Sequence, residues 1–384
     1  MREVVIVGVG MHPMGRFPEK SPIALALEAI KGALKDGNVP WKDVQAAFCS
    51  TFFLPATTGA AVLQELGSIG IPICDVENAC ASGTSALKLA SQQVAFGVCD
   101  VALAFGVEQM GKGLPDQTKN LQYQPWMLAT GLSQNVCAFA AHAQRHMHEY
   151  GTTMEQAAKV VVKNHKFGSL NPYAFYRKEN TVEEVLNSPM FSEPLTRYML
   201  CTLCTGAAAV VLCSREKANK YAGRPFVTLA ASVTGTGTYP PDFSAGLYQM
   251  SARAKPVSAT AHVSKQAYEA AGLGPEDVDI VELQDVDAFQ EIYWTEDLGF
   301  FKPGEGGPAV DRGDTGIGGK VVVSPSGGLL SNGEAMGASH LRQIVEHTWQ
   351  LRGQAGARQV PNAKVALAHV NGGTFNCGVS ILKK

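Results

Sequence analysis

Long apolar runs are missing from this sequence, and their absence argues against a membrane-spanning helix. No stretch approaches the roughly 18 consecutive apolar residues that a membrane-spanning helix requires. The apolar segment near the start, residues 3–9, is short and has no basic region before it, so it predicts a β-strand rather than a secretory signal. We therefore expect a cytoplasmic protein without a membrane span.

An excess of charge of either sign is also missing. The chain has 32 Lys and Arg against 34 Asp and Glu, which gives a formal net charge of -2. Such a balance provides no general attraction to nucleic acid or to an anionic membrane, so we expect no nucleic-acid partner. Hydrophobic residues make up 46% and charged residues 17% of the chain, a composition typical of a globular protein with ample core.

Cysteine is present, but without a disulfide pattern. The nine cysteines are an odd number, scattered along the chain and mostly set in runs of Ala, Val and Leu, which suits a reducing cytosol. Cys201 and Cys204 have the spacing CxxC, yet no second pair and no pair of histidines completes a zinc site. We interpret this pair as a buried packing patch, with a redox or metal role as the alternative, and we expect no resident metal and no bound cofactor.

The length and pattern of the chain indicate two similar halves. The 384 residues exceed the size at which a single hydrophobic core usually stops growing. Strand-like runs alternate with Ala/Leu-periodic helices through residues 3–105, which predicts an α/β layered sheet, and residues 225–382 repeat this outline. We therefore predict halves 1–220 and 221–384. From about 107 to 200, Met, Gln, Asn and aromatic residues become common, which predicts an inserted loop region that shapes a substrate pocket.

Individual elements follow from the same periodicities. The predicted strands are residues 3–9, 45–51, 72–77, 101–105, 206–213, 225–232, 277–284, 364–370 and 377–382. The predicted helices are residues 22–36, 57–68, 82–96, 137–150, 154–167, 182–188, 252–271, 287–298 and 337–352.

One cysteine lies in a setting that favours chemistry. Cys80 follows the apolar approach at residues 71–76 and precedes a predicted helix that begins near residue 82. At a strand-to-helix turn, the first amides of the helix and its dipole favour the nucleophilic thiolate. Small neighbours, Ala79 and Ala81, let a backbone or an acyl thioester approach closely. The alternative, which would be favoured for a cysteine taken alone, is a buried structural residue.

A series of small-residue and Gly-rich stretches runs along nearly the whole chain. The stretches are Asn78–Gly83, Gly206–Leu212, Gly327–Ser331, Met336–Ser339, Trp349–Arg358 and Ala368–Thr374. Each is weak evidence alone. In this order they resemble the thiolase superfamily, and especially the thiolases related to sterol carrier and lipid-transfer proteins.

The resemblance implies a five-layer αβαβα sandwich, a homodimer or dimer of dimers, and acyl-coenzyme A substrates. It also implies covalent catalysis, in which Cys80 takes an acyl group as a thioester and a second group handles the carbanion of a Claisen or retro-Claisen step. Coenzyme A is then a co-substrate. Divergent members of the superfamily often work beside a small protein with an OB-fold and a zinc ribbon, so such a partner is also expected.

Glu334 stands where members of the family place a histidine. In the family, the His of a Gly-His-Pro turn activates the cysteine, and the matching stretch here is Ser331–Ala338. An ionised carboxylate accepts a proton but cannot donate to an oxyanion. If it is desolvated, its pKa rises and it can serve as acid or base near neutrality. The alternative is a solvated or salt-bridged glutamate at a turn.

A second family element holds an oxyanion-hole group and, in the lipid-transfer type, a catalytic cysteine. It matches Leu283–Asp287 here. Gln284 replaces the histidine and can still donate a hydrogen bond through its amide, so an oxyanion role is retained. Val286 stands in the place of the cysteine and cannot move protons. Asp285 and Asp287 are candidates for orienting neighbours, although capping of the next predicted helix explains Asp287 equally well.

The third family element is a C-terminal Cys-x-Gly base, and it is absent. The matching residues are Val370–Gly372. The backbone of Gly372 and Gly373 could supply an amide to an oxyanion hole shared with the Cys80 amide. Cys377 lies further on, in a predicted strand, where a structural role is favoured over a catalytic one.

Two histidines are candidates to compensate for the missing bases. His142 lies on a predicted helix of the insert, where an apolar residue is expected, and His369 lies beside the Gly-rich loop. For each of them, a structural histidine held by hydrogen bonds is the competing interpretation.

The sequence therefore predicts an acyltransferase. The leading hypothesis is a divergent β-ketoacyl-CoA thiolase that cleaves a branched or aromatic 3-oxoacyl-CoA, for example a benzoylsuccinyl-CoA-like substrate, with coenzyme A through acyl-Cys80. One alternative is a CoA-free C-acyltransferase or Claisen-type synthase on a phenolic or ketide acceptor. An alternative of another class is an aldolase-like or scaffold subunit that does not use Cys80. No residue is assigned to coenzyme A binding.

Overall fold

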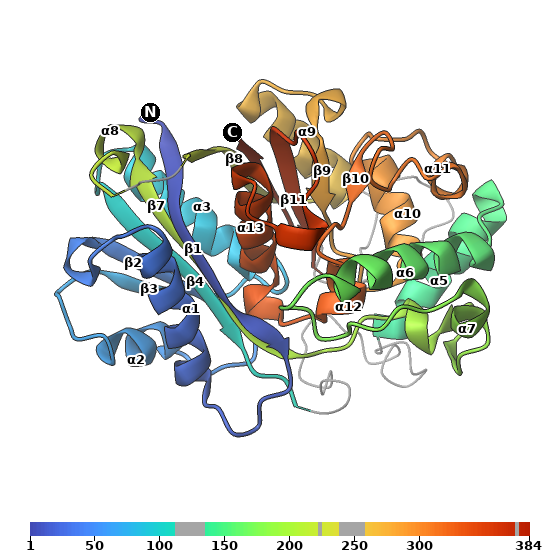
Figure 1. Ribbon diagram of the computed structural model, residues 1–384, viewed down its shortest axis with the longest axis horizontal. Helices are drawn as coiled ribbons and strands as arrows, with labels where there is room; N and C mark the ends of the chain where they lie inside the picture. Colours follow the sequence, from blue (N-terminus) through green and yellow to red (C-terminus); the bar gives the residue numbers. More distant parts are fainter. Residues whose placement is uncertain (112–134, 222–224, 238–257, 373–375) are drawn as a thin grey trace, which may run out of the picture.

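Ten strands form one mixed sheet across the molecule (Figure 1). The computed structural model describes residues 1–111, 135–221, 225–237, 258–372 and 376–384. The strands of the large sheet are β1 (Val4–Gly15), β2 (Ala46–Ser50), β3 (Ile73–Val76), β4 (Val101–Glu108), β7 (Thr205–Ser214), β8 (Val227–Thr236), β9 (Ile280–Glu282), β10 (Val322–Val323), β11 (Val365–Asn371) and β12 (Asn376–Lys383). A separate two-stranded sheet pairs β5 (Met190–Ser192) with β6 (Leu195–Thr196).

Helices cover the sheet on both faces. They are α1 (Pro22–Asp36), α2 (Thr58–Gln64), α3 (Ser82–Ala95), α5 (Asn135–Tyr150), α6 (Met154–Ser169), α7 (Val182–Leu186), α8 (Arg215–Ala218), α9 (Ala259–Ala271), α10 (Ala288–Asp297), α11 (Gly306–Arg312), α12 (Gly328–Asn332) and α13 (Met336–Arg352). No helix in the described part of the chain is both long and apolar enough to span a bilayer.

The large sheet consists of two sets of five strands with the same arrangement. In the first set, β1, β7 and β4 pair antiparallel in turn, and β4, β2 and β3 pair parallel. In the second set, β8, β12 and β11 pair antiparallel, and β11, β9 and β10 pair parallel. The chain visits both sets in the same order, which confirms the two similar halves predicted from the sequence. The sets meet where Val5 and Ile6 of β1 pair with β8. The boundary predicted at residues 220/221 falls between the sets and stays a prediction.

Two helices fill the space between the sets. α3 contacts β2 and β4 of the first set and β8 of the second, while α13 contacts β7, β4 and β11. α1 packs on β1 and β7, and α9 packs on β8 and β12. Helix layers therefore alternate with the two strand layers (Figure 1), which is the expected five-layer αβαβα sandwich.

The central layer is close-packed because glycines stand where backbones meet. A Cβ built on Gly106 of β4 would lie 2.2 Å from the carbonyl oxygen of Gly337, at the start of α13. A Cβ built on Gly83 of α3 would lie 3.1 Å from the Cβ of His340. Larger side chains would push α13 away from α3 and β4. The positions of the first turns of α3 and α13 are thus set by direct backbone contact.

Local sequence explains the element boundaries. The side chain of Ser21 accepts a hydrogen bond from the Ala24 N–H and Pro22 occupies the first turn, so α1 starts there. β4 and β7 are buried along their whole length, as expected for apolar strands covered by helices on both faces. The short elements β5, β6, α8, β10, α11 and α12 have no periodic signature and were not predicted. The strand predicted at 277–284 is shorter, because residues 275–277 form a 3₁₀ turn before β9.

The insert predicted near residues 107–200 forms α5, α6, α7 and the β5–β6 hairpin in its described part. α6 packs against α10 and α11, which follow β9, and against α12, which follows β10. The insert of one half thus covers part of the other half. The predicted helix at 252–271 is present from Ala259 as α9, and residues 252–257 lie outside the described residues.

A buried ion pair joins β9 to α13. Arg342 is 1% exposed, and its guanidinium donates to the carboxylate of Glu282, which is fully buried, over 3.1 Å. The same carboxylate accepts hydrogen bonds from the backbone and the hydroxyl of Ser326, at 2.9 Å and 2.7 Å. The pair therefore ties together a strand, a central helix and the turn that leads into α12.

Replacing Arg342 with methionine should destabilise the fold strongly. The substitution Arg342→Met leaves Glu282 buried without its cation, for which we expect a loss of about 3–5 kcal/mol in the free energy of unfolding. The matched control is Arg312→Met, because Arg312 is exposed and pairs with Asp314 at the surface; here the expected loss is below about 1 kcal/mol. Urea unfolding followed by circular dichroism measures both. Equal small losses would contradict a structural role for the buried pair.

Candidate active site

Cys80 lies in a tight turn between β3 and α3. Ala79, just before it, has a positive φ of 49°, a conformation that costs energy for a residue with a side chain. Ser82 holds the turn in place: its hydroxyl accepts from the Asn78 N–H at 2.8 Å and donates to the Ala79 carbonyl at 2.6 Å. Cys80 itself keeps partial exposure. The turn thus presents the thiol at the N-terminal end of a central helix, as predicted.

The end of the β11–β12 hairpin closes one side of this turn. A Cβ built on Gly372 would lie 3.4 Å from the backbone nitrogen of Cys80, so the end of this hairpin lies against the Cys80 turn. The Gly372 N–H donates to the Asn376 carbonyl at 2.7 Å and is therefore engaged in the hairpin. Gly373 lies outside the described residues, and the oxyanion role of this loop stays a prediction.

Glu334 lies between α12 and α13 and faces Cys80. It is 4% exposed, so it is not the solvated glutamate that the sequence left as an alternative. Its backbone N–H donates to the Thr202 carbonyl and its carbonyl accepts from the Cys204 N–H, both at 2.9 Å. Burial raises the pKa of Glu334 to about 7, against the opposing effect of hydrogen bonds from the Cys80 side chain and the Gln284 amide. A carboxyl with this pKa can exchange protons near neutrality.

Gln284 stands at the end of β9 and supports Glu334. Its Nε2 donates to Glu334 Oε1 over 2.5 Å. An amide nitrogen carries two hydrogens, so one remains for a substrate oxygen. Gln284 is 1% exposed, and its Oε1 has no hydrogen-bond partner within the described residues. The predicted oxyanion role is therefore compatible with the geometry and stays a prediction.

Asp285 orders the segment that carries Glu334. The carboxylate of Asp285 accepts from the Leu329 N–H at 2.7 Å, in the first turn of α12, and from the Asn164 side chain at 3.0 Å. Burial and the nearby Glu291 hold the pKa of Asp285 well above its usual range. Asp287 caps α10 by accepting hydrogen bonds from the Phe289 and Gln290 N–H groups, which is the capping role considered for it from the sequence. Its burial raises its pKa to about 7.

The two candidate histidines have contacts away from this cluster. His369 is fully buried in β11, where its ring bonds to the Thr260 hydroxyl at 2.9 Å, and burial lowers its pKa to about 3. His142 lies on α5 with its ring edge-on to Tyr293, and burial lowers its pKa to about 4. Both are therefore neutral near pH 7. The contacts of His369 match the competing structural interpretation, and a catalytic role for either stays a prediction.

The sequence interpretation missed Cys201. Residues 200–204 run between the segment of Gln284–Asp287 and Glu334, with the Cys201 N–H donating to the Val286 carbonyl at 2.9 Å. Cys204 is fully buried, as expected of a packing patch, but Cys201 is partly exposed. The CxxC spacing drew attention to the pair, but only the fold shows which member borders the site. No cluster of three or more His, Cys, Asp or Glu within the described ranges could hold a metal.

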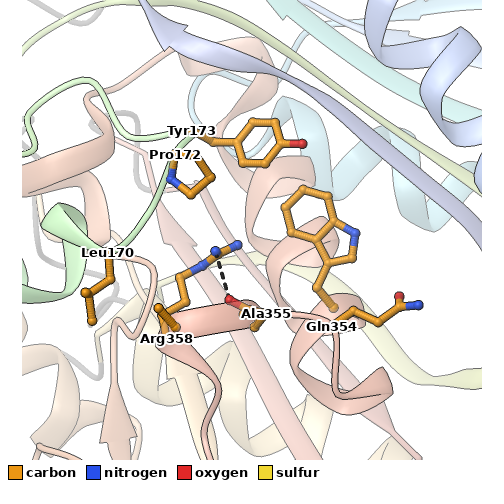
Figure 2. Close-up of a pocket in the computed structure, with 9 residues that line it drawn as sticks. Leu170, Pro172, Tyr173, Gln354, Ala355 and Arg358 are labelled. Carbon is orange, nitrogen blue, oxygen red and sulfur yellow. Dashed lines mark hydrogen bonds between the residues drawn. The ribbon is translucent and has the colours of Figure 1, made fainter.

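A separate cavity of about 520 Å³ lies beside the C-terminal end of α13 (Figure 2). Tyr173 and Trp349 pack there with ring centroids 5.1 Å apart, and Arg358 donates to the Ala355 carbonyl at 3.0 Å. Its lining residues are Leu170, Pro172, Tyr173, Trp349, Gln354, Ala355, Gly356, Ala357 and Arg358. None of them is a predicted site residue, so this cavity is distinct from the Cys80–Glu334 cluster.

Proteins with this arrangement are known. A family model described as "Thiolase, N-terminal domain" matches residues 4–216, and one described as "Thiolase C-terminal domain-like" matches residues 245–384. The chain is 36% identical to sterol carrier protein 2 of Oryctolagus cuniculus, covering 95% of this chain and 69% of that protein. It is 37% identical to an acetyl-CoA acetyltransferase of Methanothermobacter thermautotrophicus, covering 97% of each.

The chain is also similar to two proteins whose names describe them as parts of multi-subunit enzymes. The chain is 36% identical to the benzoylsuccinyl-CoA thiolase subunit BbsB of Thauera aromatica, over 97% of this chain and 95% of that protein. The solved structure of an Ltp2-ChsH2(DUF35) aldolase superposes with a TM-score of 0.87 at 25% identity, over 99% of this chain and 98% of that one. With both halves matched by family models and relatives above 30% identity along nearly the whole length, this chain belongs to the thiolase family of acyltransferases.

Proposed function

We propose that the chain is a β-ketoacyl-CoA thiolase that cleaves a branched or aromatic 3-oxoacyl-CoA with coenzyme A through an acyl thioester on Cys80. The contact of the Cys80 side chain with the buried carboxylate of Glu334 carries the proposal. A nucleophile held against a base is the arrangement that covalent acyl transfer needs. The likeness to an acetyl-CoA acetyltransferase and to a benzoylsuccinyl-CoA thiolase subunit supports this substrate class.

The reaction begins with proton transfer from the Cys80 thiol to Glu334. The thiolate attacks the 3-oxo carbon, and the resulting alkoxide accepts hydrogen bonds from the Cys80 backbone N–H and the Gln284 amide. The alkoxide collapses, the bond between C2 and C3 breaks, and the C2 carbanion takes up a proton. Coenzyme A then attacks the acyl-Cys80 thioester, and Glu334 returns its proton to the departing Cys80 thiolate.

An aldolase is the competing function, favoured by the structural likeness to the Ltp2-ChsH2(DUF35) aldolase. In an aldolase that does not use the cysteine, Cys80 forms no acyl adduct. The contact between Cys80 and Glu334 argues for the thiolase, because that contact has no function if the thiol stays idle. The two functions differ in one measurable species, acyl-Cys80.

We also propose that the chain works as a homodimer, with a small OB-fold and zinc-ribbon protein as a further partner. β3 ends the large sheet, and Ile73 and Cys74 at this edge are exposed. An exposed edge strand offers backbone groups to a second copy of the chain. The structural likeness to a DUF35-partnered enzyme supports the smaller partner.

Acylation of Cys80 tests the proposal directly. Incubation of the purified chain with acetyl-, succinyl-, benzoyl- and a branched acyl-CoA, with and without co-expressed small partner, should give a mass increase of one acyl group on the intact protein. The increase should vanish in Cys80→Ala, because the thioester cannot form, and persist in the control Cys74→Ala, whose thiol is exposed at the sheet edge. If no donor acylates the wild-type chain even with the partner present, the aldolase-like function replaces the thiolase.

The pH dependence of acylation should follow Glu334. Its carboxyl must be ionised to accept the thiol proton, so the acylation rate should rise with pH through about 7 and level off above it. Among the described residues, Cys80, Gln284, Cys201 and Cys204 face this carboxyl. In Glu334→Gln we expect the rate to fall by about 10²-fold or more, with the rise lost. Quenched-flow mass spectrometry from pH 5.5 to 8.5 measures both.

The control for this pH dependence is Asp287→Asn. The pKa of Asp287 is also about 7, and asparagine still caps a helix. This variant should keep the rise with pH. If the rise with pH disappears in Asp287→Asn and remains in Glu334→Gln, the titrating carboxylate is Asp287. That result would contradict the role given to Glu334.

A further inference from the structure

We propose that Cys201 is the catalytic acid and base at the carbanion carbon, the group that gives a proton to C2 after C–C cleavage and removes it in the reverse direction. This inference rests on the proposed thiolase function. It names the residue that protonates the C2 carbanion in that reaction. The residues that carry such chemistry elsewhere in the family are replaced by Val286 and Val370, whose side chains cannot exchange a proton.

The backbone places Cys201 across from Val286. Leu200 and Asp287 form an antiparallel bridge, and the next residues along, Cys201 and Val286, are joined by the hydrogen bond from the Cys201 N–H to the Val286 carbonyl at 2.9 Å. Residues directly opposite each other in an antiparallel pair direct their side chains to the same face. The thiol of Cys201 therefore lies on the face that Val286 shares.

The same segment is joined to Glu334 on its other side. Leu203 and Glu334 form a parallel bridge, with hydrogen bonds from the Glu334 N–H to Thr202 and from the Cys204 N–H to Glu334, both at 2.9 Å. Glu334 in turn contacts the side chain of Cys80. Glu334 and Cys201 are thus held together by backbone pairing between three segments, and the Cys80 side chain contacts Glu334.

Accessibility separates the two cysteines of the CxxC pair. Cys201 keeps partial exposure, whereas Cys204 is fully buried with its Sγ 3.7 Å from the Asn332 carbonyl oxygen. Burial, together with the carboxylates of Glu334, Asp285 and Asp287, raises the pKa of the Cys201 thiol well above its usual range. The thiol therefore holds its proton at neutral pH, as a donor to a carbanion must.

Two buried hydrogen-bond acceptors near residues 200–204 have no partner within the described residues. Gln284 Oε1 and Asp287 Oδ2 have no hydrogen-bond partner in the described part of the chain, although both side chains are at least 99% buried. An unmet buried acceptor is costly unless a ligand completes it. Asp287 is paired with Leu200 and Gln284 contacts Glu334, so both acceptors belong to the surroundings of Cys201. They mark the place where a polar group of the substrate binds.

The proton balance closes with this assignment. The C2 carbanion takes the proton of the Cys201 thiol and leaves a Cys201 thiolate. When the thiol of coenzyme A attacks acyl-Cys80, its proton passes to the Cys201 thiolate, while Glu334 reprotonates Cys80. All three groups return to their starting states without an added reactant.

Hydrogen–deuterium exchange at C2 isolates this step. The full chain, with its partner if one is needed for acylation, is incubated with acetyl-CoA or succinyl-CoA in D₂O, and loss of the C2 proton signal is followed by NMR. We expect Cys201→Ala and Cys201→Ser to slow the exchange by about 100-fold or more, while acylation of Cys80 stays within about threefold of wild type. The matched control Cys204→Ala should keep both activities. Thermal melts confirm that each variant is folded, and the serine variant covers the case in which alanine disturbs packing.

Each of the remaining outcomes overturns either the assignment of Cys201 or the proposed function. Exchange at the wild-type rate in either Cys201 variant overturns the assignment, and so does a parallel loss of exchange and acylation, which shows a merely structural role. If the wild type acylates Cys80 but exchanges no C2 proton, the assignment to Cys201 fails and the thioester chemistry stands. If the wild type forms no acyl-Cys80, the proposed function fails first and the inference fails with it.

Discussion

Two buried carboxylates at the end of β9 are the constraint on which the site depends. Glu282 binds the backbone and hydroxyl of Ser326, and Asp285 binds the first turn of α12, so together they hold the turn that leads to Glu334. Carboxylates removed from water destabilise a protein unless charge or hydrogen bonds compensate. Arg342 compensates Glu282, and backbone N–H groups compensate Asp285. The geometry of the candidate site is therefore a consequence of how these buried carboxyl groups are satisfied.

A glutamate in place of a histidine changes the electrostatics of thiol activation. Proton transfer from a thiol to imidazole creates two opposite charges, which a low-dielectric interior must stabilise as a pair. Transfer from Cys80 to Glu334 only moves one negative charge from oxygen to sulfur. Burial penalises the anion before and after the transfer. It also raises the pKa of Glu334 to about 7, closer to the pKa of about 8.5 of an ordinary thiol, so less free energy separates the two states.

Features that depend on local sequence pattern, such as helices, strands and turns, could be predicted from the sequence. Features that depend on contacts between distant segments could not. The turn at Cys80, helix α1 and strands β4 and β7 follow from periodicity, caps and apolar runs, and all are present. The identity of Glu334 was predicted from its place in a motif, but its burial was left open, because it depends on Gln284 and Thr202 from two other segments. The place of Cys201 beside Glu334 was missed for the same reason. β10, with two residues, is too short for any period to show.

The repeated strand order also explains how Cys80 and Glu334 come to lie against each other. In the first set, the third strand leads into the Cys80 turn and the central helix α3; in the second set, the third strand leads through α12 to Glu334 and the central helix α13. Cys80 and Glu334, the proposed nucleophile and its proposed proton acceptor, therefore occupy equivalent places in the two halves, and the helices that follow them touch at Gly83. An internal pseudo-twofold axis brings two copies of one crossover face to face. In the proposed reaction, one copy supplies the sulfur of Cys80 and the other supplies the proton acceptor Glu334.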